Sequence, residues 1–464
     1  MSGSGLAMFH KLLLAYFGFF GVFWFLGIDQ FYFLLFCLTG LMTHLMSKRT
    51  PQTVEVLLFA GFVLVTFASA VQITSGHRLI TYLRNEGVYT AMLFVLLSTS
   101  FAAAKKPNIT DRMYLILLLF SLQCTVVAFL AASGTNLTFK SLGAHVIPDL
   151  GSKYIHGMLN KSSIQSDAQW FSDGFKRPRG LMLYSNTMAG VLCASMAIKA
   201  FFALKFWSEK KQLFTVICVI AILMDGFSVY SALSRSTWLG FAFALAVFPF
   251  VFKTSLPAKF LPAIIAVLAV GLIVATGLHE GFILRLTEKG HSNEGRGLNY
   301  LLVWQMTTSS IDTLLIGHGT QLDHHLISVP VGSHSTYIGM FFKFGLLGIT
   351  LFLLFLFSMY RRMFTMTKDV RELNRRGHNI TRPYFLCFGL IVLLVQMTFI
   401  EVDVDAAYAM FVAVLMFLVI QESRNMRAMV EDPTLTLDSG TSARVNRDPG
   451  IEPRSTEITV SGTG

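Results

Sequence analysis

The sequence predicts an all-α integral membrane protein with about twelve transmembrane helices, and composition gives the first reason. Hydrophobic residues make up 54% of the 464 residues, charged residues make up only 14%, and the mean hydropathy is +0.60. A typical soluble domain carries about 45–50% apolar and about 25% charged residues. The chain is therefore too apolar and too poor in charge to be a soluble domain.

A series of apolar runs separated by polar breaks is the second observation. A helix needs roughly 20 apolar residues to cross the hydrocarbon core, and most runs approach this length. The expected spans are 8–28, 30–46, 54–72, 88–104, 112–132, 181–204, 213–233, 236–252, 258–278, 336–360, 383–400 and 406–421. The first run lacks a small-residue cleavage site, so we expect a retained span rather than a removed signal peptide.

The third observation is the placement of Lys and Arg, which collect in short cytoplasmic loops. Basic residues follow alternate spans and agree with cytoplasmic N- and C-termini: Lys48, Arg49, Lys105, Lys106, Lys210, Lys211, Lys253, Lys259, Arg361, Arg362, Lys368, Arg371, Arg375, Arg376 and Arg382. The net charge of +11 therefore reflects the distribution of Lys and Arg between the two sides of the membrane. The high hydrophobicity of the chain argues against a nucleic-acid partner.

Two units follow from this pattern. Residues 1–421 form the polytopic domain, with two long outside loops at about 133–180 and 279–335, and residues 422–464 form a cytoplasmic tail. The tail is rich in Ser, Thr, Asp and Gly, which predicts disorder. The five Cys lie at or within expected spans without CxxC spacing, so we expect neither disulfides nor a thiolate metal site.

Arg and His gather at the outside edge of the membrane in four places. Arg177 and Arg179 close the first long loop, and Arg235 stands in a Ser-Arg-Ser turn. Arg296, between two glycines, and His334 belong to the second long loop. A lone outside Arg such as Arg235 departs from the usual charge bias, which favours a function for it.

Arginines at a lipid–water boundary suit a diphosphate group. Their guanidinium groups bind phosphate oxygens in pairs and stay charged at every physiological pH. They can also neutralise the charge that develops on a diphosphate leaving group. No Asp-x-Asp pair stands on the long outside loops; the nearest acidic run is 401–405. The pattern is therefore compatible with a site that has no cofactor and no metal, and it does not exclude a metal.

The segment HSTYIGMFFKFGLLG carries a family resemblance. Nine residues separate His334-Ser335 from Gly345, and Gly348 completes a Gly-x-x-Gly pair. This arrangement resembles the signature of bacterial O-antigen ligases, whose superfamily includes O-antigen and exopolysaccharide polymerases and some protein O-oligosaccharyltransferases. The Arg-x-x-Gly stretch leading to Asn186, the Ser-Arg-Ser turn and the Gly-Arg pair resemble it as well.

The resemblance implies a membrane glycosyltransferase of type C in the bacterial inner membrane, with its active site facing the periplasm. It implies that an acceptor hydroxyl attacks a glycan linked to undecaprenyl diphosphate, with inversion and without a metal. By matching position, His334 would orient or deprotonate the acceptor, and Arg179, Arg235 and Arg296, with Arg177 beside them, would bind the donor diphosphate. We count His334 and Arg296 as the expected catalytic pair. A His suits proton transfer because its ordinary pKa lies near ambient pH.

Two functional alternatives stay open within and outside this superfamily. A ligase would join the glycan to lipid A–core, whereas a polymerase would extend a second lipid-linked glycan, and the motif fits both. A transporter or flippase would instead carry charged or broken helices near the bilayer midplane. The outside charges lie at loop edges, which argues against transport. Membrane lipid surrounds the chain in every case.

Structural interpretations stand beside the functional ones. Arg177 and Arg179 could be interfacial side chains, His334 could cap the next span, and the two glycines could serve helix packing. A zinc site joining His334 to His318, His324 and His325 matches no ligand spacing. Lys199 is expected to extend to the cytoplasmic interface.

The sequence also departs from the family pattern in two places. Lys343 stands two residues before Gly345, where an acid is expected. An aromatic residue usually follows the loop arginine closely, whereas Trp304 lies eight residues beyond Arg296, with Tyr300 nearer.

Overall fold

The computed structural model describes residues 2–29, 32–47, 53–101, 108–135, 137, 141–146, 164–167, 176–251, 290–327, 329–378 and 380–432. These form a helical protein with one small two-stranded sheet. The elements are α1 (Ser2–Gly18), α2 (Phe20–Leu26), α3 (Tyr32–Ser47), α4 (Val54–Ala68), η1 (Ser69–Gln72), α5 (Gly76–Phe101), α6 (Asn108–Ala132), α7 (Leu142–Val146), β1 (Gln165–Asp167), β2 (Lys176–Pro178), α9 (Ser185–Ser208), α10 (Gln212–Ser231), α11 (Arg235–Val251), α14 (Gly290–Thr307), α15 (Ile311–Ile316), α16 (Thr336–Arg375), α17 (Arg382–Gln396), η2 (Val402–Val404) and α18 (Ala406–Glu431).

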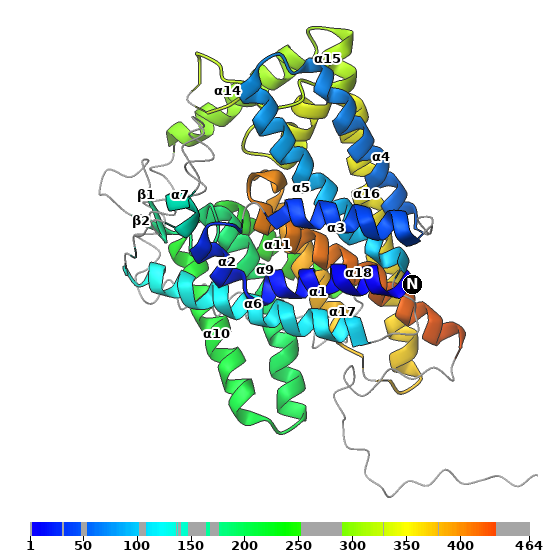
Figure 1. Ribbon diagram of the computed structural model, residues 1–464. Coiled ribbons are helices and arrows are strands. Elements are labelled where there is room, and N and C mark those ends of the chain that lie inside the picture. Colours follow the sequence, from blue (N-terminus) through cyan, green and yellow to red (C-terminus); the bar gives the residue numbers. More distant parts are fainter. Residues whose placement is uncertain are drawn as a thin grey trace, which may run out of the picture.

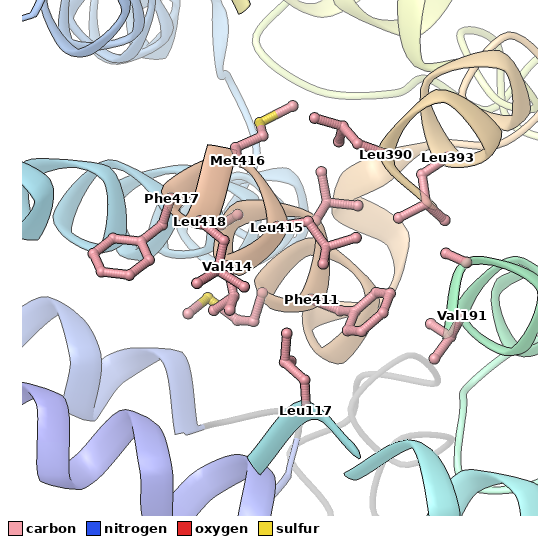
Figure 2. Close-up of a cluster of buried hydrophobic side chains, with 14 of the residues drawn as sticks. Leu117, Val191, Leu390, Leu393, Phe411, Val414, Leu415, Met416, Phe417 and Leu418 are labelled. Carbon is pink, nitrogen blue, oxygen red and sulfur yellow. The ribbon is translucent and has the colours of Figure 1, made fainter. Parts of the chain in front are cut away.

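The core is built around α18. Every residue of its most apolar 18-residue stretch is buried inside the protein. Figure 2 shows Phe411, Leu415 and their α18 neighbours between Leu117 of α6, Val191 of α9 and the α17 residues Leu390 and Leu393. A helix that is apolar on all sides belongs in the centre of a fold. Asp405 fixes where it begins, because its side chain accepts the backbone N–H of Ala407 and Tyr408.

Other helices surround this centre in pairs (Figure 1). The hairpin of α9 and α10 packs on α6 and α17, and α16 packs on both α4 and α18. The connection from α4 to α5 lies near α15, at the end of the molecule that also holds α14 (Figure 1). In contrast to α18, α10 exposes a row of large apolar side chains, which include Leu213, Ile220 and Leu223. Such a face fits contact with lipid.

The all-α membrane class predicted from sequence agrees with the structure. Among the described residues, six helices are long and apolar enough to cross a membrane, or seven if α1 and α2, bent by 74°, form one span. Shorter apolar helices occupy 34–43, 235–248 and 382–396. Each expected span has a helix at its place except 258–278, which lies outside the described residues together with most of the first long loop and the start of the second, 279–289.

Three predicted boundaries need correction. The helix expected from residue 88 begins at Gly76, and the one expected to end at 360 continues to Arg375. The tail boundary at 421 is also wrong, because α18 continues to Glu431. The added turns are amphipathic rather than wholly apolar, and Met426 and Met429 are buried in the same core cluster as Met363 and Met366. A search for apolar runs therefore places the ends of these helices too early. Residues 433–464 lie outside the part of the chain that the structure describes.

Candidate functional site

His334 lies in the turn directly before α16 and has a left-handed backbone conformation, with φ of 70°. This conformation is uncommon for a residue with a side chain. Its neighbours fix it in place: Ser335 caps α16 by accepting the N–H of Ile338, and Thr336 donates its hydroxyl to the Ile400 carbonyl at 2.6 Å. The backbone N–H of His334 donates to Glu401 Oε1 at 3.1 Å. The turn before α16 and the turn before α18 thus form one unit.

Helix α14 is joined to the same turn through Asn299. The buried Asn299 side chain donates to the Ser333 carbonyl and hydroxyl, at 3.2 and 3.1 Å, and accepts the Gly332 N–H at 3.0 Å. Residues three apart share a helix face, so this contact places Arg296 near His334. Burial, and then the charge of Arg296, lower the pKa of His334 to about 4. The imidazole is therefore neutral at neutral pH.

Arg177 and Arg235 reach this region from two other elements. Arg177 lies on β2 opposite Ser166 of β1, and its Nε donates to the Ala232 carbonyl at 2.6 Å. Arg235 begins α11 after a tight turn in which Leu233 has φ of 48°. Burial, followed by the charges of Arg235 and Arg296, lowers the pKa of Arg177 to about 10. We call Arg177, Arg235 and Arg296 the arginine cluster.

Arg179 has a different environment from Arg177. Its backbone N–H donates to the Ile164 carbonyl at 2.9 Å, and its charge acts on Tyr184. The side chain of Arg177, by contrast, donates from Nη2 to Asn186 Oδ1 at 2.7 Å. The contacts therefore bring Arg177 together with the other two arginines predicted from sequence, and they associate Arg179 with the Tyr184 side of the site.

A cavity of about 750 Å³ opens beside His334. Tyr184, Asn186 and Glu401 line it together with His334. Asn186 also accepts from Arg177, so one side chain joins the arginine cluster to the cavity wall. A volume of this size accommodates several sugar rings or a comparable polar ligand.

Two carboxylates in the cavity wall share one lysine. Lys343 Nζ lies 2.6 Å from Asp403 Oδ2 and 3.4 Å from Glu401 Oε2, and all three side chains are buried. Burial raises the pKa of Glu401 to about 7, against the opposing charge of Lys343. Burial also tends to raise the pKa of Asp403, but the closer Lys343 holds it below its ordinary value. The basic residue found at 343 is thus neutralised by acids from the turn before α18.

The structure explains why residue 345 is a glycine. Helix α16 is broken there, with φ of 63° and ψ of −164°, and a Cβ would lie 2.4 Å from the Leu315 carbonyl carbon. The break frees the carbonyl groups of Phe342 and Lys343, which accept the N–H groups of His318 and Gly319 at 2.9 and 2.7 Å. The predicted packing role of Gly345 is therefore correct, and its partner is the end of α15.

Several residues at the site escaped the sequence analysis. Arg78 and Arg84 of α5 line the cavity, as do Glu401 and Asp403. The charge bias that favours a function for Arg235 applies equally to the two α5 arginines, which precede the span expected from residue 88. The acids were recognised only as a run, because nothing in the sequence joins residue 401 to 334.

Lys199 and the three histidines at 318, 324 and 325 lie in surroundings of their own. Lys199 does not extend to the interface as expected: it is buried, and its Nζ lies 2.5 Å from Asp225 Oδ2. His324 and His325 stack on each other, whereas His318 packs on Phe342. Within the described ranges, no three His, Cys, Asp or Glu side chains are grouped as a metal site would require.

Comparison with known proteins adds a decisive observation. Residues 216–353 match the family model described as O-antigen ligase. This match supports the O-antigen ligase and polymerase superfamily, which the chain resembles over these residues. No curated protein and no solved structure matches the chain significantly.

The O-antigen ligase match covers Arg235, Arg296 and His334. Arg177, Arg179, Glu401 and Asp403 lie outside it, on either side. The site therefore combines residues from the matched region with residues that only the fold brings beside them.

Proposed function

We propose that this O-antigen ligase-type protein transfers a glycan from undecaprenyl diphosphate to an acceptor hydroxyl, with inversion and without a metal. The observation that carries the proposal is the arginine cluster near His334, which lines the 750 Å³ cavity together with Asn186, the hydrogen-bond partner of Arg177. Among the alternatives, we favour a ligase that joins the glycan to lipid A–core. A polymerase that extends a second lipid-linked glycan is the alternative.

The arginine cluster suits the leaving group. Burial and the neighbouring positive charges lower the pKa of Arg177 and of Arg296, so the three guanidinium groups are brought together at an energetic cost, since like charges repel. A bound diphosphate relieves that repulsion and accepts paired hydrogen bonds from each guanidinium group. The same contacts stabilise the charge that grows on the diphosphate as its bond to the anomeric carbon breaks.

His334 suits the acceptor. As the acceptor oxygen forms its bond to the anomeric carbon, the hydroxyl must lose its proton, and a neutral imidazole can accept it. The low pKa of about 4 in the free protein makes His334 a weak base. A bound diphosphate offsets the charge of Arg296 and so raises the pKa of His334 when the donor is present. The proton then passes from the imidazole to solvent or to the released diphosphate.

We place the chain in the bacterial inner membrane with both termini cytoplasmic and the site facing the periplasm. The support is the distribution of Lys and Arg, because the clusters at 361–382 lie at the opposite end of α16 from His334. With twelve spans, one of them at 258–278, the two ends of the chain would lie on the same side.

A transfer assay tests the function directly. The purified protein in detergent, with chelator present, would receive an undecaprenyl-diphosphate glycan together with lipid A–core or a second lipid-linked glycan. Glycosylated lipid A–core supports the ligase, and a ladder of lengthened lipid-linked glycan supports the polymerase. If neither product forms while His334→Ala behaves like the parent, the transferase proposal is wrong and transport becomes the leading alternative.

A further inference from the structure

Two arginines in the cavity have no part in the mechanism above. Arg78 and Arg84 project from α5 into the cavity wall. Arg78 Nη2 donates to the His318 carbonyl at 2.6 Å, and its buried Nε has no hydrogen-bond partner among the described residues. Arg84 Nη1 donates to the Asp403 carbonyl at 2.5 Å and to Asn85 Oδ1 at 3.0 Å. These contacts hold both guanidinium groups at the cavity with hydrogen-bonding capacity left on Arg78.

The acidic side chains that line the cavity neutralise the positive charge of these arginines only in part. Glu401 and Asp403 are already paired with Lys343. Asp323 also lines the cavity but is exposed, so water screens its charge. Within the described part of the chain, Arg78 forms no ion pair. The wall thus has a cationic edge at Arg78, beside amide and hydroxyl groups such as Gln321 and Thr81.

This mixture fits a phosphorylated sugar better than a bare anion. Amide, hydroxyl and carboxylate side chains bind sugar hydroxyls, whereas a guanidinium binds phosphate through paired charged hydrogen bonds. The cavity of about 750 Å³ has room for both parts of such a ligand.

The stereochemistry of the proposed transfer indicates which substrate binds in the cavity. In an inverting displacement, the acceptor oxygen approaches the face of the sugar opposite to the leaving diphosphate. In the proposed function the arginine cluster holds the diphosphate, and the described lining of the cavity contains Arg78 and Glu401, which accepts the His334 N–H, but no member of that cluster. The acceptor therefore occupies the cavity.

We infer that Arg78, supported by Arg84, forms a binding site for an anionic group of the acceptor, a phosphate carried by the acceptor glycan close to its reacting hydroxyl. This inference rests on the proposed function and specifies its acceptor. It favours a phosphorylated lipid A–core over a growing lipid-linked chain, because the reacting end of such a chain lies far from its own diphosphate.

The first test measures binding and needs no turnover. Parent, Arg78→Gln and Arg78→Lys proteins in detergent would be titrated with phosphorylated lipid A–core and with the same glycolipid after phosphatase treatment. Arg112→Gln, a change at an exposed arginine of α6, is the matched control. We expect the parent and the control to bind the phosphorylated form about tenfold more tightly, and Arg78→Gln to lose most of this preference while Arg78→Lys keeps part of it.

The outcomes separate this inference from the proposed function. A parent that binds both glycolipids equally, or an Arg78→Gln protein that keeps the full preference, overturns the acceptor phosphate site. If Arg78→Gln fails to fold because its contact with His318 is lost, the parent and Arg78→Lys still decide. In the transfer assay, we expect Arg78→Gln to raise KM for phosphorylated acceptor without changing KM for the donor. Absence of any transfer by the parent would instead refute the proposed function.

Discussion

Positive charge occurs in two contrasting settings in this protein. Lys199 and Asp225 form a fully buried ion pair between α9 and α10, and Ser195 and Thr125 complete its hydrogen bonds. The arginine cluster gathers three like charges beside a neutral histidine. The first arrangement pairs opposite charges, whereas the second places like charges next to one another. The difference teaches which charges support the fold and which are expected to support function.

The largest expected effect is at His334, on the functional side of this comparison. We expect His334→Ala to reduce transfer by about 10²–10⁴-fold, because the acceptor hydroxyl loses its proton acceptor. The thermal midpoint should stay close to that of the parent, since the hydrogen bond to Glu401 comes from the backbone N–H. Rates of glycan transfer in detergent check the first statement and thermal unfolding the second. Unimpaired transfer by a folded variant would refute the catalytic role.

The second effect belongs to the buried pair. Asp225→Asn leaves the Lys199 charge without its partner in a dry environment, which should destabilise the protein by about 3–5 kcal/mol. Replacing both residues, with Lys199→Met and Asp225→Leu, should recover much of this loss. Thermal unfolding in detergent would measure both variants, and transfer per folded molecule should be unchanged. Loss of transfer in a stable double variant would show that this pair is functional rather than structural.

A smaller effect is expected within the arginine cluster. Arg177→Gln, Arg235→Gln and Arg296→Gln should each weaken donor use by about 1–3 kcal/mol, or about 5- to 150-fold in kcat/KM. Arg179→Gln is the matched control, two residues from Arg177 but associated with Tyr184. We expect it to affect the donor less than Arg177→Gln does. Equal losses from both variants would contradict the distinction drawn between them, and unchanged donor use in all four would remove the diphosphate site.

The smallest effect is a shift in pH dependence. Because burial and Arg296 lower the pKa of His334 to about 4, the acidic limb of kcat/KM should lie well below pH 6.5. Arg296→Gln removes a neighbouring positive charge, so the protonated imidazole becomes easier to form and this limb should move to higher pH. Burial keeps it below 6.5. An acidic limb that does not move in Arg296→Gln would show that another group controls it.

The residues along α16 show how far a sequence pattern reaches. The spacing of His334, Gly345 and Gly348 suggested the family that the match over residues 216–353 supports, and the apolar run after His334 predicted a span. The pattern gave no sign of the break at Gly345 or of the contact with α15 that requires it. Nor did it explain Lys343, whose acidic partners stand about 60 residues later. Local patterns predict local structure, and these contacts are long-range.

By itself, the sequence determined that this is a helical membrane protein and which arginines and histidine deserved attention. Hydrophobicity and charge bias act residue by residue, so they can be recognised without a fold. Only the tertiary structure decided that Arg177 lies close to Arg235 and Arg296, that Glu401 holds the His334 turn, and that Arg78 and Arg84 face the same cavity. Those relations depend on how separate helices pack against α18, and packing geometry is a property of the whole chain.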